Sequence, residues 1–156
     1  MLPILLILAQ IGGGAAPPAK VAASIARIFG RGAIATPVVV GVDTALRVTR
    51  GDSLLGFAVV RNVKGKDQPI TFLVAIDPSD RLKDVDILVY REPYGGEVAY
   101  EAWRRQFRGK SAADTLEVGR QIRSISGATI SVNAVTAGVR RAVGDLTTWH
   151  LEGKIK

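Results

Sequence analysis

The sequence predicts a single α+β domain in which an antiparallel β-meander precedes the helices. Four segments rich in β-branched and apolar residues follow one another, with only short polar turns between them. After them, apolar residues recur at intervals of three and four between residues 132 and 146, as on the buried face of a helix. The expected strands cover residues 45–50, 54–63, 70–76 and 85–89.

Residues that favour turns bound each expected strand. Gly51-Asp52 separates the first two strands and predicts a hairpin. A polar loop over 62–69 follows, and Asp77-Pro78-Ser79-Asp80 closes the third strand. The fourth strand alternates apolar residues with Asp84 and Asp86, so one of its faces should be wetter.

The other segments predict helices and connections around this meander. Residues 21–29 have helical spacing, and the glycines and proline of 30–37 indicate a linker. A further helix is expected over 98–107, with Val98, Trp103 and Phe107 inward, and 120–125 is expected to form a short strand before the last helix. The chain therefore divides into a leader (1–19), a helix and linker (20–43), the main domain (44–147) and a polar tail (148–156).

Composition excludes several classes of site. The chain has 156 residues, no Cys and one His, so a thiolate metal site, a Ser–His–Asp triad and a multi-histidine metal centre are not expected. The net charge of +7 permits binding to nucleic acid or anionic lipid. Because the chain shows no helix-turn-helix pattern and no interleaving of aromatic and basic residues, no nucleic-acid partner is expected.

The N-terminus carries an apolar run, Leu2 to Ile11, followed by small residues. A membrane-spanning helix needs about 20 apolar residues, so the run suits a signal peptide or a short anchor over 1–19 better than a spanning segment. No basic residue precedes Lys20, which departs from the usual signal pattern. The alternative is a hydrophobic strand or helix that packs on the domain.

The most informative segment is the hexapeptide Ser126-Gly127-Ala128-Thr129-Ile130-Ser131, which leads directly into the last helix. Free backbone N–H groups and the positive end of the helix dipole make a helix start a natural phosphate site. The three hydroxyl groups there can bind a phosphate, or one of them can carry it covalently. The alternative is an ordinary N-cap, which contributes about 1 kcal/mol.

This hexapeptide resembles the flavin-attachment motif of the FMN-binding domain family, found in small subunits of Na⁺-translocating NADH:quinone reductases and Rnf-type electron-transport complexes. The resemblance extends from about residue 56 to 143 and includes Gly65-Lys66, Arg91-Glu92-Pro93-Tyr94-Gly95-Gly96-Glu97 and Gln106-Phe107-Arg108-Gly109-Lys110. It implies that a flavin transferase, using FAD, links FMN to Thr129 through a phosphoester. Family members often carry Asp six residues before this Thr, where the chain has Arg123. That departure leaves open a noncovalently held FMN.

The loop over 92–97 is the candidate contact for the flavin ring. Paired Gly95 and Gly96 let a backbone approach a flat ring closely, and Tyr94 can pack against it. The resemblance places Glu92 beside the flavin. The alternative is an ordinary strand-to-helix turn. Lys110 is a candidate for the phosphate or the ribityl chain, or else a solvent-facing basic residue.

The leading hypothesis is an electron-transfer flavoprotein module that carries FMN and exchanges electrons with a membrane-associated redox partner. It would act as a carrier rather than a stand-alone enzyme, and the resemblance together with the leader favours a place outside the cytoplasm. Two alternatives remain: a noncatalytic basic adaptor at a membrane surface or on nucleic acid, and an FMN-dependent reductase of small molecules. A Gly-x-Gly-x-x-Gly fingerprint for a nicotinamide donor is absent from the sequence.

Overall fold

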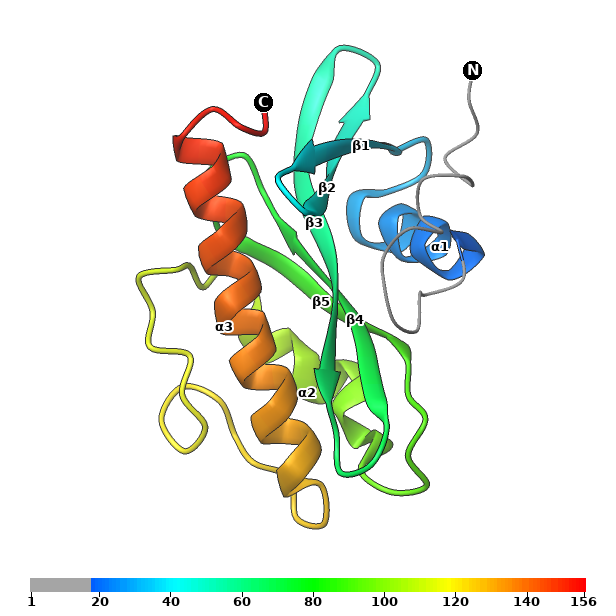
Figure 1. Ribbon diagram of the computed structural model, residues 1–156, viewed down its shortest axis with the longest axis vertical. Coiled ribbons are helices and arrows are strands. Elements are labelled where there is room, and N and C mark those ends of the chain that lie inside the picture. Colours follow the sequence, from blue (N-terminus) through cyan, green and yellow to red (C-terminus); the bar gives the residue numbers. More distant parts are fainter. Residues whose placement is uncertain (1–17) are drawn as a thin grey trace.

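The computed structural model describes residues 18–156 (Figure 1). The expected leader therefore lies almost wholly outside the described residues. The elements, in chain order, are α1 (Pro18–Phe29), β1 (Ile34–Val40), β2 (Asp43–Arg50), β3 (Ser53–Lys64), β4 (Pro69–Ile76), β5 (Leu82–Val89), η3 (Gly96–Ala99), α2 (Glu101–Arg104), η4 (Arg105–Phe107) and α3 (Thr129–Leu151).

All five strands form one antiparallel sheet in the order β1-β2-β3-β4-β5, so the predicted α+β meander followed by helices is confirmed. The expected linker was wrong in its second half, because β1 occupies part of it and adds a fifth strand. Pro37 lies inside β1, opposite Leu46 of β2. A proline cannot donate a ladder hydrogen bond, but an edge strand has one side without a partner strand and tolerates it.

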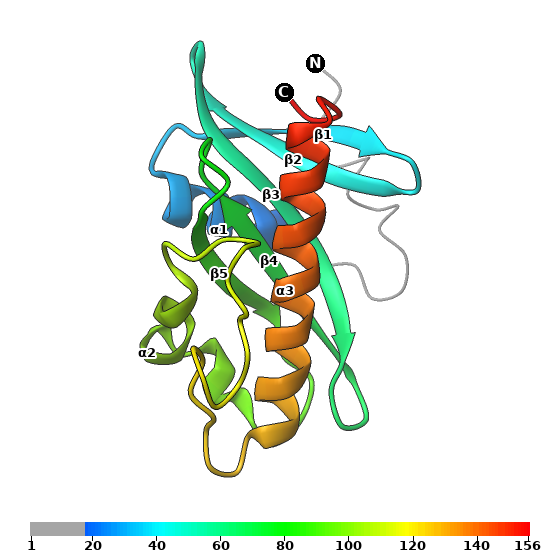
Figure 2. The same cartoon turned by 90° about the vertical axis from the view of Figure 1, so that its left-hand side faces the viewer.

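The sheet is covered on both faces, by α3 on one and by α1 on the other (Figure 2). Phe57, Phe72 and Val74 pack towards α3, whereas Ala58, Leu73 and Ala75 pack towards α1. For this reason nearly every residue of the interior strand β4 is buried.

The expected helix over 98–107 is broken into η3, α2 and η4. Its predicted inward residues Val98, Trp103 and Phe107 are buried, as expected. The Trp103 indole N–H donates to the backbone oxygen of Arg123 at 2.8 Å. This bond ties the helical segment to the chain that leads into α3. That chain contains an isolated bridge between Val118 and Ile122 instead of the expected strand over 120–125.

The polar tail expected from residue 148 was wrong. The helix α3 continues to Leu151, and Trp149 and Ile155 are buried in the core below it. The backbone N–H groups of Lys154 and Ile155 donate to the Trp149 oxygen. Trp149 and Ile155 therefore join the C-terminus to the core, although most of their sequence neighbours are polar.

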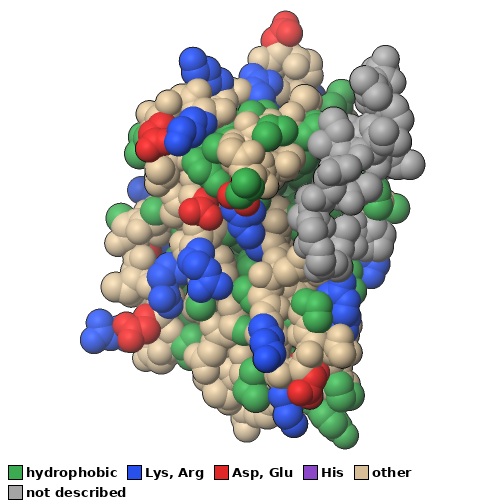
Figure 3. Space-filling model, viewed as in Figure 1, with side chains coloured by type: hydrophobic (Ala, Val, Ile, Leu, Met, Phe, Trp, Pro, Cys, Tyr) green, Lys and Arg blue, Asp and Glu red, His purple; other side chains and the backbone are tan. Residues whose placement is uncertain are grey.

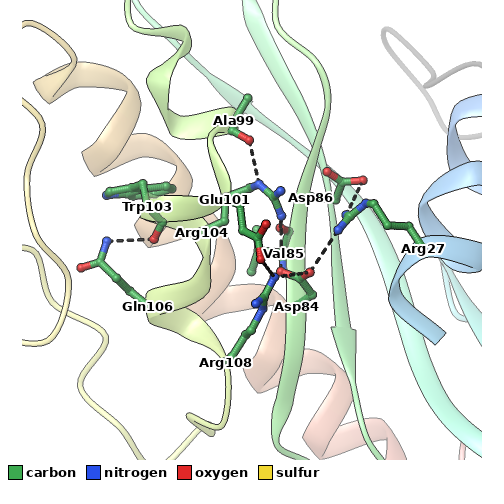
Figure 4. Close-up of polar contacts among 10 residues, drawn as sticks. All are labelled: Arg27, Asp84, Val85, Asp86, Ala99, Glu101, Trp103, Arg104, Gln106 and Arg108. Atoms are coloured by element: carbon green, nitrogen blue, oxygen red, sulfur yellow. Dashed lines mark hydrogen bonds and ion pairs between the residues drawn. The ribbon is translucent and has the colours of Figure 1, made fainter. Parts of the chain in front are cut away.

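A buried carboxylate connects α1 to the helical segment on the other side of β5 (Figure 4). Asp84 of β5 accepts hydrogen bonds from Arg27 of α1 (3.3 Å), Arg104 of α2 (3.4 Å) and Arg108 (3.2 Å). Arg27 also pairs with Asp86 at 2.8 Å. The Asp84 carboxylate therefore links three arginines that come from α1 and from the helical segment after β5.

On the face drawn in Figure 3, Lys and Arg side chains are spread out, and several lie beside Asp or Glu. Within the described residues, Arg61 pairs with Asp43 and Asp145, and Lys154 pairs with Glu152. The positive net charge is therefore not gathered into one patch on this face. Within residues 18–156, no helix combines the length and the apolar character that crossing a membrane requires.

Candidate functional site

The predicted attachment turn forms the start of α3. Gly127 has a φ of 80°, a left-handed conformation that glycine adopts without strain. Ala128 is the N-cap residue of α3, and no side chain caps the helix by a hydrogen bond. The hydroxyl groups of the turn therefore do not serve as the N-cap that the alternative interpretation required.

The first intrahelical bond of α3 runs from the Val132 N–H to the Ala128 oxygen at 2.9 Å. The N–H groups of Thr129, Ile130 and Ser131 come before it, so helix geometry gives them no intrahelical acceptor. The first turn also contains no acidic residue. Thr129 is exposed at the first position of the helix. This arrangement suits an anion at the positive end of the helix dipole.

A cavity of about 400 Å³ opens beside this turn. Three segments that are distant in sequence line it: the β3–β4 turn, the loop after β5 and the start of α3, all at the same end of the molecule in both views (Figures 1 and 2). The lining residues are Lys66, Asp67, Glu92, Pro93, Tyr94, Gly95, Gly127, Ala128, Thr129, Ile130 and Ser131. The structure thus brings the loop at 92–97 and the turn at 126–131 around one space, and adds Lys66 and Asp67.

Glu92 fixes the β3–β4 turn against this loop. Its Oε1 accepts hydrogen bonds from the backbone N–H groups of Gln68 (2.8 Å) and Asp67 (2.6 Å). These two bonds, with the nearby charge of Lys66, hold the pKa of Glu92 below its ordinary value. The Glu92 carboxylate is therefore part of the cavity framework as well as of its lining.

A second set of contacts joins the loop to α3. The Tyr90 hydroxyl donates to the backbone oxygen of Tyr94 and lies 2.7 Å from the Ser131 hydroxyl. Gly95, with a φ of 87°, passes so close that an added Cβ would lie 2.6 Å from the Tyr90 oxygen and 2.8 Å from the Ser131 Oγ. Glycine is therefore required where the backbone of residue 95 passes between the Tyr90 and Ser131 hydroxyl groups. The Ser131 side chain is consequently buried against Tyr90, although its residue type and position had suggested a phosphate ligand.

The remaining predicted site residues are placed differently. Ser126 is exposed and is not among the lining residues, and Gly96 lies against the Tyr90 ring. Lys110 lines a different cavity, of about 560 Å³, together with Arg123. The Lys110 ammonium donates to the backbone oxygen of Gln106 at 2.5 Å. The structure therefore does not place Lys110 at the attachment turn.

The rim of the smaller cavity carries large apolar side chains in solvent. Tyr94 is 82% exposed and Ile130 is 53% exposed. The cavity thus offers N–H donors and a hydroxyl for a phosphate, a lysine in its wall and apolar contacts for a flat ring. The donor set fits a flavin mononucleotide, with glycine backbone where the ring must approach closely.

This combination defines a binding domain for a phosphate-bearing aromatic cofactor. Residues 65–144, just over half of the chain, match the FMN-binding domain family, and the chain belongs to that family with FMN as its cofactor. The chain is also similar to a subunit of the proton-translocating ferredoxin:NAD(+) oxidoreductase complex of Clostridium ljungdahlii. The two are 32% identical over a match 108 residues long, and the match covers 64% of this chain. The chain spans 58% of the length of that curated relative.

Sequence reasoning missed Lys66, Asp67 and Tyr90 as site residues. Gly65-Lys66 belongs to the stretch that resembles the family, but nothing local shows that a hairpin turn will lie against the start of α3. The match to the family begins at Gly65. The resemblance at Gly65-Lys66 is the sequence signal that could have pointed to this turn.

Proposed function

We propose that the protein is an electron-transfer flavoprotein module that carries FMN in the cavity at the start of α3, bound through a phosphoester to Thr129. The observation that carries the proposal is the placement of the Thr129 hydroxyl. It stands exposed at the first position of α3, on the wall of a cavity whose other residues suit a flavin. An enzyme that modifies this side chain would find it accessible.

The attachment step balances with FAD as the co-substrate. The Thr129 oxygen attacks the phosphorus on the riboflavin side of the FAD pyrophosphate, the bond to the AMP oxygen breaks, and the hydroxyl proton is released. The products are the Thr129 phosphoester and AMP, and no oxidation or reduction occurs. By the resemblance to the family, a separate flavin transferase would catalyse the step.

Bound FMN supplies one- and two-electron redox chemistry. The residues of this chain would then bind and orient it. The helix start would hold the phosphate, and Tyr94 and Ile130 would offer apolar contact to the ring. Tyr90 with Ser131 fixes the loop that carries Tyr94. Because the cavity is open to solvent at an exposed apolar rim, a partner could approach the ring closely.

The Clostridium ljungdahlii relative bears the name of a subunit of a proton-translocating complex. By this similarity we propose other subunits of such a complex as the redox partners, with at least one of them associated with a membrane. The apolar leader supports a place on the outer face of that membrane. The whole complex's activity is not assigned to this chain.

Mass spectrometry tests the attachment. Protein co-expressed with a flavin transferase should gain the mass of one FMN linked with loss of water, and the denatured band should fluoresce under ultraviolet light. Thr129→Ala should abolish the gain, whereas Ser126→Ala should keep it, since Ser126 lies outside the cavity lining. A full gain in Thr129→Ala would contradict the assignment of the residue.

Arg123 allows a second outcome for the same site. If the transferase requires an acid at this position, wild-type protein will stay at its polypeptide mass, and Arg123→Asp should restore modification. FMN should still bind reversibly in that case. If neither attached nor free FMN associates, the flavoprotein proposal fails, and the adaptor hypothesis, with its steep salt dependence, becomes the one to test.

A further inference from the structure

A cationic side chain near the start of α3 would strengthen the binding of a flavin phosphate there. The sequence suggested Lys110, but the structure places that ammonium at another cavity. Among the described residues that line the cavity beside Thr129, the cationic side chain is Lys66. It belongs to the β3–β4 turn, which lies at the same end of the molecule as the start of α3 (Figure 1).

The β3–β4 turn is held in place from two sides. Within the turn, the Gly65 N–H donates to the Gln68 oxygen at 2.9 Å. From outside, the Glu92 carboxylate accepts the N–H groups of Asp67 and Gln68. A Cβ on Gly65 would lie 2.9 Å from the Glu92 Oε1, so the turn packs closely on this carboxylate. The backbone of Lys66 is therefore fixed, and only its flexible four-carbon stem can move.

Charge balance makes Lys66 important for an anionic ligand. Asp67 and Glu92 bring two carboxylates to the same wall of the cavity. A phosphate that enters this space would meet like charges from that wall. Lys66 is adjacent to both, and it interacts electrostatically with Glu92. An ammonium there offsets the repulsion and can donate a charge-assisted hydrogen bond to a phosphate oxygen.

We infer that Lys66 binds the phosphate of FMN together with the start of α3, and that Glu92 positions it by holding the β3–β4 turn. The inference rests on the proposed function. Lys66 is then a specificity residue: it favours FMN over riboflavin, which has the same ring and ribityl chain but no phosphate.

Comparing these two flavins tests the inference. Protein expressed without a transferase is titrated with FMN and with riboflavin, and flavin fluorescence is followed. Lys66→Gln should weaken FMN binding on the order of tenfold and leave riboflavin binding unchanged, as expected for one charge-assisted bond. Lys66→Arg should retain most of the affinity. Lys110→Gln is the matched control and should change neither titration.

A second measurement uses covalently loaded protein, in case reversible binding is too weak to follow. The phosphorus NMR resonance of the attached FMN should shift in Lys66→Gln and stay in place in Lys110→Gln. Circular dichroism of each variant checks that it is folded.

The outcomes separate the two proposals. If wild-type protein takes up no FMN by either route, the proposed function fails. If wild-type protein takes up FMN but Lys66→Gln binds it equally well, or shows an unshifted resonance, the role of Lys66 is refuted while the function stands. An equal loss of riboflavin and FMN affinity would also refute it, because the lysine would then act on the ring or on the fold.

Discussion

Replacement of Asp84 by Asn should destabilise the protein more than any other single charge removal around β5. Asn keeps the shape of the side chain but removes the negative charge that faces Arg27, Arg104 and Arg108. Three guanidinium groups would then lie around a neutral amide. The resulting repulsion and the loss of pairing should appear directly in the free energy of unfolding.

Burial sets the magnitude. The side chains of Asp84 and Arg104 are 7% and 8% exposed, whereas those of Arg27 and Arg108 are 43% and 39% exposed. Removing one partner of a buried ion pair costs about 3–5 kcal/mol. Arg104 keeps hydrogen bonds to the Val85 and Ala99 oxygens, and water screens the two exposed arginines, so we expect the lower end, about 3 kcal/mol. The midpoint of thermal unfolding should fall by about 6–12 °C.

Urea and thermal unfolding followed by circular dichroism measure this loss. Asp86→Asn is the matched control, because Asp86 pairs with the half-exposed Arg27 and should cost about 1 kcal/mol or less. If Asp84→Asn costs no more than this control, the buried pair with Arg104 contributes nothing beyond a surface contact, and the reasoning from burial is wrong.

Three further changes test the packing and the site. Gly138→Ala places a methyl group 2.6 Å from the Phe72 ring and should lower the free energy of unfolding by about 1–3 kcal/mol. Gly144→Ala meets no neighbour and should raise it by about 0.5–1 kcal/mol. Chemical denaturation of both variants measures the difference. Gly95→Ala strains a left-handed residue against two hydroxyl groups and should lower FMN affinity at least several-fold, and unchanged affinity in a flavin titration would show that the loop adapts. The lowered pKa of Glu92 means that its ionised form stabilises the fold above its unfolded-state pKa, near 4.5. This contribution is lost as the pH falls through the lower folded-state pKa. The stability of Glu92→Gln should therefore depend less on pH below about pH 5, and thermal unfolding at each pH measures this.

Much of the fold was predictable because it depends on local patterns. The apolar spacing of the last helix, the turn residues between the strands and the inward positions of Trp103 and Phe107 all follow from sequence-local rules. The strand β1 was missed because Pro37 and the flanking glycines are typical of a linker. A proline inside a strand is compatible with an edge, and the edge position is a property of the whole sheet. The same reason explains the tail, where Ile155 is buried only because α3 runs far enough to place it over the core.

The candidate site was predictable in its segments and not in its contacts. The resemblance singled out the loop at 92–97 and the turn at 126–131, and both reach one cavity. Lys66 and Lys110 have the same chemistry, and each follows a glycine directly. The packing of the β3–β4 turn against Glu92 brings Lys66 into the lining of the cavity beside Thr129, whereas Lys110 lines another cavity. Which lysine lines the cavity depends on tertiary structure, and the periodicity of the sequence does not predict it.

The contacts also change the roles that residue types suggested. Ser131 looked like a phosphate ligand and Glu92 like a flavin ligand, yet each already has a protein partner: Tyr90 for Ser131 and the β3–β4 turn for Glu92. A side chain that is fixed by such a contact positions its neighbours and loses little entropy when a ligand arrives. By contrast, Thr129 and Tyr94 stand exposed. The cavity lining therefore contains residues with protein partners and residues that stand exposed. Under the proposed function, a substitution in the first group should alter FMN binding through the loop rather than through a lost flavin contact.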